Sequence, residues 1–437
     1  MKKIDLTQGK VLKVITALAL PIMGSSFLQF ANNLIDMIWV GKLGSNAVAS
    51  IGSASFFVSL GYSINSLVVI GTGIKVSHSE GKKDDIGSEH YINAGLIINL
   101  VLAIVYALIL VLGRKGLIGF LNLNNPIVEK DAYVYLAISG LTIFFTFFNS
   151  LYSRIQGSFG NNKTALKINS IGIIINIILD PIFIYVFNLG VGGAAVATLV
   201  ATVIMFVLYK IKSRGLIEYK KHIKIEYSKV KEIIKLGSPM AFQRVLFTLI
   251  NIVVARIIAV FGADAIAAQK IGVQVESISF MVIGGLNGAI ASFTGQNFGA
   301  KKFDRIKEGY KSSIIIGILY SGFIAILFWI FPEILTRIFV SKQSTIDIAI
   351  SYLQIIAFSM IFGAVEMVSN GLFTGIGKPN IPAVISILFT ALRIPIAIIL
   401  SKFMGIEGVW WSTAVTSMLK GTTSYLFYIF ESKKLPR

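Results

Sequence analysis

The sequence has 437 residues, of which 55% are hydrophobic and 14% are charged, with a net charge of +19 and no cysteine. Soluble globular chains carry about 25% charged residues, so this composition points to a membrane protein. The lack of cysteine excludes disulfides, a thiolate nucleophile and a cysteine metal site.

Apolar runs predict about twelve transmembrane helices, because a helix needs about 20 apolar residues to cross a bilayer. The expected spans cover residues 13–40, 46–75, 91–113, 127–153, 164–187, 190–212, 232–260, 264–293, 308–331, 344–371, 380–402 and 405–431. The charged connection 213–231 is an expected cytoplasmic linker. It separates an expected N-terminal lobe, residues 1–212, from an expected C-terminal lobe, residues 232–437.

The first span carries a polar stripe in an otherwise apolar run. Its members follow one another at spacings of four, three and four residues, so they lie on one face of a helix. They are Ser25, Gln29, Asn32 and Asp36.

The fifth span carries Asn176 and Asp180 in its middle. A carboxylate at mid-membrane depth costs roughly 2.5–3.5 kcal/mol on insertion scales, so such a residue usually faces a cavity or marks an ion path. Pro181 follows directly and donates no N–H, which frees the carbonyl of Ile177 beside this polar face. The alternative interpretation is a buried aspartate that is paired for packing.

The two sets of six spans resemble each other in one register. Gly262 lies 218 positions after Gly44, and Pro239 lies 218 positions after Pro21. Fixed self-similarity over six spans indicates a duplication whose halves are parallel repeats. We therefore predict an all-α integral membrane fold with twelve transmembrane helices in two six-helix lobes, related by a pseudo-two-fold repeat.

Lysine and arginine gather in alternate connections between the spans. The basic segments are residues 2–13, 210–231, 301–307 and 433–437, whereas the opposite connections have almost no cations. By the positive-inside rule, we expect the basic connections and both termini to face the cytoplasm. The net charge thus reflects topology in a multi-pass protein of the cell membrane, and no nucleic acid partner is expected.

Several duplicated motifs resemble the MATE (multidrug and toxic compound extrusion) family over nearly the whole chain. They are LALPIMGSSFLQFANNLIDMIWVGKLG, the turn GSFGNNKTA, NIILDP from Asn176 to Pro181, and the paired endings GVGGAAVAT and GIEGVWWST. The resemblance implies twelve helices in two lobes, and export of organic cations driven by inward movement of Na⁺ or H⁺.

The resemblance also implies an ion-coupling site in the N-terminal lobe. Asp36 matches a first-helix carboxylate of the family, Asn176 and Asp180 match a fifth-helix pair, and Thr198 matches a sixth-helix hydroxyl. These oxygens suit a hard cation such as Na⁺, so the same four residues are the expected metal site if Na⁺ is the coupling ion. Two buried carboxylates repel each other, so the site can equally carry a proton. No other cofactor is expected.

The C-terminal lobe departs from one pattern of the family, in which a glutamate stands early in the seventh helix and an aspartate stands in the tenth. Gln243 and Gly363 occupy those positions here, and glutamates occur instead at Glu276 and Glu366. We expect these glutamates to face Arg244, Arg256 and Arg393. Two roles stay open for this cluster: a structural salt-bridge cluster or substrate binding.

We therefore expect a monomeric secondary active multidrug exporter in membrane lipid, with small organic cations as substrates. The expected substrate-binding residues are Gln29, Asn32, Asp36, Glu276 and Glu366. The alternative is a lipid or lipid-linked oligosaccharide flippase of the related superfamily, although an acidic cavity suits anionic head groups poorly. No nucleophile–base spacing appears in any loop, so an enzyme is not expected.

Overall fold

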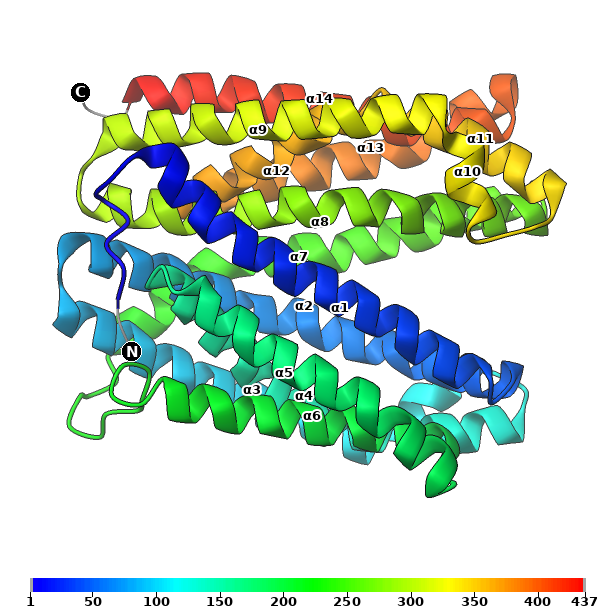
Figure 1. Ribbon diagram of the computed structural model, residues 1–437, viewed down its shortest axis with the longest axis horizontal. Coiled ribbons are helices and arrows are strands. Elements are labelled where there is room, and N and C mark those ends of the chain that lie inside the picture. Colours follow the sequence, from blue (N-terminus) through cyan, green and yellow to red (C-terminus); the bar gives the residue numbers. More distant parts are fainter. Residues whose placement is uncertain (1–2, 435–437) are drawn as a thin grey trace. The chain divides into compact units, whose positions relative to one another are not determined.

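The computed structural model describes residues 3–434, which form helices and no strands (Figure 1). The helices are α1 (Val11–Gly41), α2 (Ser45–Lys82), α3 (Asp85–Phe120), α4 (Pro126–Ser158), α5 (Asn162–Pro181), the π-helix η1 (Ile182–Val186), α6 (Gly190–Lys212), α7 (Tyr227–Ala259), α8 (Ala263–Gly299), α9 (Phe303–Ile330), α10 (Pro332–Arg337), α11 (Gln343–Ala357), α12 (Met360–Gly375), α13 (Asn380–Met404) and α14 (Ile406–Lys434). The basic residues Lys2 and Arg437 lie outside the described part.

Most predicted spans are confirmed as long apolar helices. Within the described residues, ten helices are long and apolar enough to cross a membrane, and α11 and α12 together make an eleventh span with a bend of 56°. The expected span 344–371 thus corresponds to a bent pair of helices, because the chain breaks at Phe358 and Ser359. The buried Ser359 hydroxyl donates to the Ile356 carbonyl at 2.8 Å, which satisfies that carbonyl outside the regular helix pattern.

The described chain forms two compact units, each with its own core. Unit 1 contains residues 3–5 and Gly24–Ala241, and unit 2 contains Leu6–Met23 and residues 242–434. These boundaries differ from the expected lobes because α1 and α7 each divide between the units. Ile15 on α1 belongs to an apolar cluster of unit 2, whereas Ile233 on α7 belongs to the core of unit 1.

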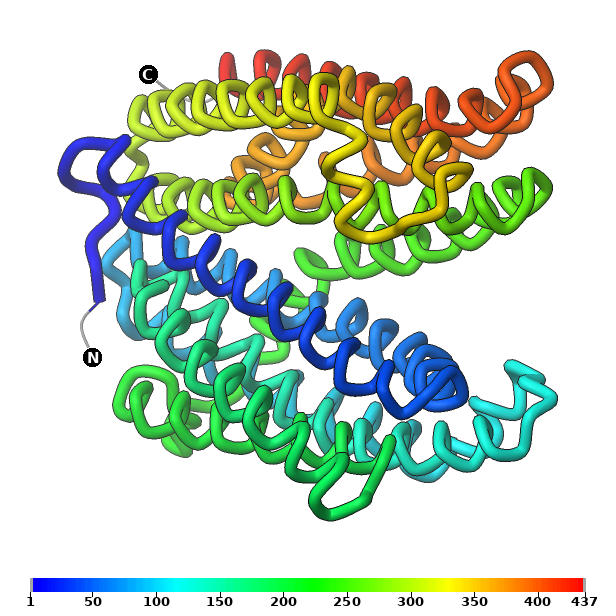
Figure 2. Tube along the Cα trace, turned by 45° about the vertical axis from the view of Figure 1, so that its right-hand side comes forward, coloured from blue at the N-terminus to red at the C-terminus, as the bar shows by residue number. Residues whose placement is uncertain are grey.

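Within unit 1, α4 is the central helix, with α2, α3 and α6 packed along it (Figure 2). Phe147, Leu151 and Ile155 of α4 are fully buried in this core. Within unit 2, α12 takes the corresponding place and packs against α8, α9 and α14. Burial of such large apolar side chains stabilises each helix against its neighbours.

The predicted repeat is also visible in the local backbone. Gly44 and Gly262, 218 positions apart, precede α2 and α8 with φ of 103° and 97°. Lys83 and Lys301, also 218 positions apart, follow the same two helices, each with φ of 57°. Positive φ is uncommon outside glycine, so shared positions of this kind support the duplication predicted from the sequence.

Candidate ion and substrate site

Helices α1, α5 and α6 bring three of the four predicted ion-site residues to one cavity of about 320 Å³ in unit 1, whereas Asn176 does not line it. Asp36 comes from α1, Asp180 from the end of α5, and Thr198 from α6. The residues that line the cavity are Asn33, Asp36, Met37, Val40, Val48, Ile51, Gly52, Ser55, Tyr135, Asp180, Ile184, Ala194 and Thr198. The cavity thus combines two carboxyl groups with largely apolar walls.

A chain of hydrogen bonds links the polar stripes of α1 and α5. The Asn32 amide Nδ2 donates to Asp36 Oδ2 at 3.0 Å and to Asn176 Oδ1 at 3.1 Å. Asn176 Nδ2 in turn donates to Asp180 Oδ1 at 3.1 Å. Asn32, Asn176 and Asp180 are all buried. The two carboxyl groups are therefore held by two amides, and Asn32 belongs to the same network as the predicted ion-site residues Asp36, Asn176 and Asp180.

Three buried oxygens in this network accept no hydrogen bond from any N–H or hydroxyl donor among the described residues. They are Asn32 Oδ1, Asp36 Oδ1 and Asp180 Oδ2. The carboxyl groups of Asp36 and Asp180 also lie close enough for their charges to interact, so the pair is unfavourable while both are negatively charged. Buried acceptors without donors are costly. The residues therefore fit either a shared proton or an oxygen-liganded cation.

The local backbone beside Asp180 is irregular because of Pro181. The α-helix ends at Pro181 and continues as the π-helix η1. The Tyr185 hydroxyl of this π-turn donates to the Trp39 carbonyl of α1 at 2.6 Å, and the two rings meet edge to face. The irregular turn after the proline therefore connects α5 directly to the part of α1 that carries Asp36.

Two of the predicted site residues, Thr198 and Gln29, form no hydrogen bond with either carboxyl group. Thr198 lines the cavity, but its hydroxyl donates to the Ala194 carbonyl of its own helix at 3.0 Å and to neither carboxyl group. Gln29 is exposed and donates to Asn33 Oδ1 at 3.2 Å, so the structure does not bring it into the Asp36 network. Gln29 lies two turns before Asp36 on α1 and does not itself line the cavity, although its partner Asn33 does.

Sequence reasoning missed the contributions of α2 and α4 to the cavity. Ser55 of α2 and Tyr135 of α4 both line it. Ser55 shares a helix face with Ser59 and Tyr62, and Tyr135 shares one with Asp131 and Ser139, so these polar stripes on α2 and α4 were the signal that could have found them.

Two acidic residues of unit 2, Glu276 and Glu366, belong to a second polar cluster that is partly buried. Glu276 of α8 accepts a hydrogen bond from the Tyr352 hydroxyl at 2.8 Å. Glu366 of α12 lies 4.0 Å from the ammonium of Lys420, a buried residue of α14 that sequence reasoning missed. Arg393 of α13 is also buried, and its positive charge interacts with both glutamates without a direct ion pair. The cluster therefore balances two acidic groups with two basic groups.

The expectation that Arg244 and Arg256 face the glutamates is not supported. Both arginines are exposed on α7 within unit 2, and neither forms an ion pair with a described acidic residue. The glutamates come from α8 and α12, and the cation that forms an ion pair with one of them is Lys420 of α14. Gln243 of α7 donates instead to the Ser386 hydroxyl at 2.8 Å.

Comparisons with known proteins agree with this architecture. The family model MatE matches residues 21–182 and 239–399. The probable multidrug resistance protein YpnP of Bacillus subtilis is 26% identical, over 98% of this chain and 97% of its own length. The probable multidrug resistance protein NorM of Thermotoga maritima is 27% identical, over 96% and 92%.

Two solved structures share the fold over 100% of this chain and 99% of their own. One is an outward-facing multidrug resistance MATE family transporter of the MOP superfamily, with a TM-score of 0.93 and 21% identity. The other is a MOP superfamily transporter from Pyrococcus furiosus with a binding pocket of reverse polarity that suggests a different function, with a TM-score of 0.92 and 21% identity. These identities establish likeness of fold alone.

Proposed function

The chain belongs to the MatE family, and from this premise we propose that it is a secondary active multidrug exporter that moves organic cations out in exchange for Na⁺ or H⁺. The observation that carries the proposal is the unit 1 cavity, which Asp36 and Asp180 both line. Two carboxylates at one cavity are unfavourable without a compensating positive charge. A proton, Na⁺ or an organic cation can each supply that charge.

Competition for these carboxyl groups would couple the two fluxes. A coupling ion that occupies Asp36 and Asp180 neutralises the charge that an organic cation needs, so the two ligands exclude each other. A bound ion also favours a different packing of α1 and α5 from the empty pair of carboxylates. Such differential affinity is what allows a gradient to shift the populations of two states.

The cavity walls support an amphiphilic substrate. Met37, Val40, Val48 and Ile51 surround the acidic pair with apolar surface. Methionine and aliphatic side chains adapt to ligands of different shape, as a multidrug site requires. A headgroup with negative charge would instead meet the two carboxylates, which disfavours the flippase alternative.

Coupling is assigned to unit 1 because unit 2 supplies its own cations. Glu276 and Glu366 already have the positive charges of Arg393 and Lys420 nearby. A mobile cation would therefore bind there less favourably than at Asp36 and Asp180. In this proposal both glutamates adjust substrate preference or stabilise unit 2.

The decisive experiment is efflux of a fluorescent organic cation from proteoliposomes under separately imposed Na⁺ and H⁺ gradients. Acceleration by one gradient, lost in Asp36→Asn, is the expected result. Equal efflux with and without either gradient would refute coupled export. Movement of a fluorescent anionic lipid under the conditions in which the cation stays inside would favour the flippase. The proposed setting is a multi-pass monomer in the cell membrane with both termini in the cytoplasm.

A further inference from the structure

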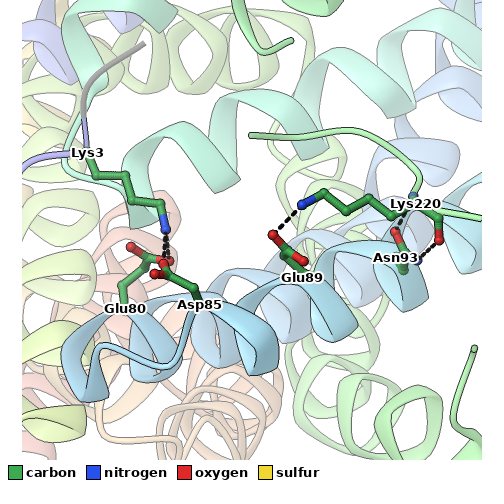
Figure 3. A network of polar contacts seen from close by, with 6 residues as sticks. All are labelled: Lys3, Glu80, Asp85, Glu89, Asn93 and Lys220. Atoms are coloured by element: carbon green, nitrogen blue, oxygen red, sulfur yellow. Dashed lines mark hydrogen bonds and ion pairs between the residues drawn. The ribbon is translucent and has the colours of Figure 1, made fainter. Parts of the chain in front are cut away.

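The connection between α6 and α7, residues 213–226, is fixed to unit 1 by its own polar groups. The Gln156 amide donates to the Ser213 hydroxyl at 2.9 Å. Asn93 of α3 donates to the Lys220 carbonyl at 2.9 Å and accepts from the Lys220 N–H at 3.0 Å, and the Lys220 ammonium pairs with Glu89 (Figure 3). The buried side chains of Ile217 and Ile223 complete the attachment.

This attachment holds a row of cations on the outer side of the connection. The exposed basic residues from the end of α6 onward are Lys210, Lys212, Arg214, Lys221 and Lys224. None of them forms an ion pair or a side-chain hydrogen bond with another described residue. The segment has two acidic residues, Glu218, which is exposed, and Glu226, which lies 3.2 Å from His90, so the five cations outnumber them. The outer side therefore carries positive charge that unit 1 does not neutralise.

The contacts with α3 place the connection at the edge of the apolar part of that helix. Glu89 and His90 end the charged first turns of α3, and a long apolar run begins at Tyr91. Asn93 and Glu89, which bind Lys220, straddle this boundary. Polar head groups surround a transmembrane helix at the level where its apolar run begins.

Apolar side chains accompany the cations at this level. Tyr219 is 45% exposed, Ile225 is 41% exposed and Tyr227 is 79% exposed. Tyrosine is enriched at membrane interfaces, where its ring lies at the depth of the head groups. Basic residues directly beyond a transmembrane helix attract anionic lipids, each contributing roughly fivefold to binding.

We propose that the outer face of residues 210–227 is a binding surface for the head groups of anionic phospholipids. Arg214, Lys221 and Lys224 would contact the phosphates, while Tyr219 and Tyr227 lie among the head groups. Charge alone would also suit an acidic protein, but exposed aromatic side chains beside a transmembrane boundary fit a lipid surface. The proposal does not depend on the transported substrate.

The test uses the full chain, into which a single cysteine can be placed because it has none. His222 is exposed between Lys221 and Lys224, so His222→Cys carrying a bimane fluorophore reports on this surface. The protein is reconstituted in phosphatidylcholine nanodiscs that contain doxyl-labelled phosphatidylglycerol or, at the same mole fraction, doxyl-labelled phosphatidylcholine. Quenching by the labelled phosphatidylglycerol should be about threefold stronger or more, and 0.5 M salt should reduce it, because ions screen this attraction.

A second experiment removes positive charge from the proposed lipid-binding surface. Lys221→Gln with Lys224→Gln should bring quenching by the two labelled lipids close to equality. The matched control is Lys115→Gln with Lys130→Gln, two exposed lysines toward the opposite end of α3 and at the start of α4, which should leave the difference unchanged. Equal quenching by both lipids in the parent protein would overturn the proposal. The proposal would also be overturned if the Lys221/Lys224 variant kept the parental difference in quenching between the two labelled lipids. Displacement of the labelled phosphatidylglycerol by millimolar inorganic phosphate would overturn it as well.

Discussion

At the scale of single residues, the two units place different chemistry at equivalent positions. Arg393 lies 217 positions after Asn176, and the paired endings GVGGAAVAT and GIEGVWWST align Thr413, one turn before Thr416, with Thr198. In unit 1 the Asn176 amide contacts Asp180, whereas in unit 2 Arg393 Nε donates to the Thr416 hydroxyl at 3.3 Å. A tethered guanidinium thus occupies the part of unit 2 that corresponds to the proposed cation site of unit 1.

The carboxyl groups of Asp36 and Asp180 should act together in coupling. Asp36→Asn and Asp180→Asn each remove one charge at nearly constant volume, so gradient-driven efflux should fall by about tenfold or more while the protein still folds and binds drug. The double variant should be no worse than either single variant, since residues that act together are not additive. Initial efflux rates in proteoliposomes measure this.

Asp347→Asn is a matched control for these variants, because Asp347 is exposed in unit 2 and its loss should leave efflux unchanged. Efflux at the parental rate by Asp36→Asn, under an imposed gradient, would remove unit 1 from the coupling mechanism.

The glutamates of unit 2 should affect stability or substrate choice without affecting coupling. Glu366→Gln leaves the buried Lys420 ammonium without its acidic partner, which should destabilise unit 2 by about 3 kcal/mol. Adding Lys420→Met should restore the melting temperature measured in detergent. Glu276→Gln should change which compounds are exported.

Both glutamate variants should keep their dependence on the ion gradient when they are expressed normally. If either loses that dependence, the coupling site belongs to unit 2 instead.

At the scale of helices, two tight turns repeat with a conformation that only glycine adopts readily. Gly44 precedes α2 with φ of 103° and ψ of 173°, and Gly262 precedes α8 with φ of 97° and ψ of 176°. A Cβ at either position would meet no neighbouring atom, so the restriction is in the backbone itself. These turns set the direction in which α2 and α8 leave the preceding helices.

Gly44→Ala should therefore destabilise unit 1 by about 1–3 kcal/mol. Gly41→Ala is the control, because Gly41 is the last residue of the helix α1 and an added Cβ there also meets open space. It should leave the melting temperature unchanged or raise it slightly. Thermal unfolding in detergent compares the two, and similar melting temperatures would show that the turn tolerates a side chain.

At the scale of the whole molecule, the distribution of lysine and arginine predicts which ends of the helices face the cytoplasm. Cysteines at His222 and Leu189, both exposed, should react with an impermeant maleimide from opposite sides of the membrane. Ser213 is a poor position for such a label because its side chain is fully buried. The cysteine-free parent provides the background. Reaction of both positions from one side would exclude the predicted topology.

Local patterns determined much of this protein from the sequence alone. The length and hydropathy of a run decide whether a helix can cross a membrane, so most spans were predictable. Helical spacing likewise decides which residues share a face, and it correctly placed Asn32 and Asp36 together on α1 and Asn176 and Asp180 together on α5. The register of the repeat was also readable, because glycines mark backbone positions that other residues avoid.

Only the tertiary structure decided which of these faces meet. Asn32 binds Asn176 across 144 positions of sequence, and Lys420 lies beside Glu366, because α1 packs near α5 and α14 packs against α12. The division of α1 between two units has the same origin, since an apolar stripe does not specify its partner. Side-chain periodicity is a property of one helix, whereas a site assembled from several helices depends on how their surfaces fit together.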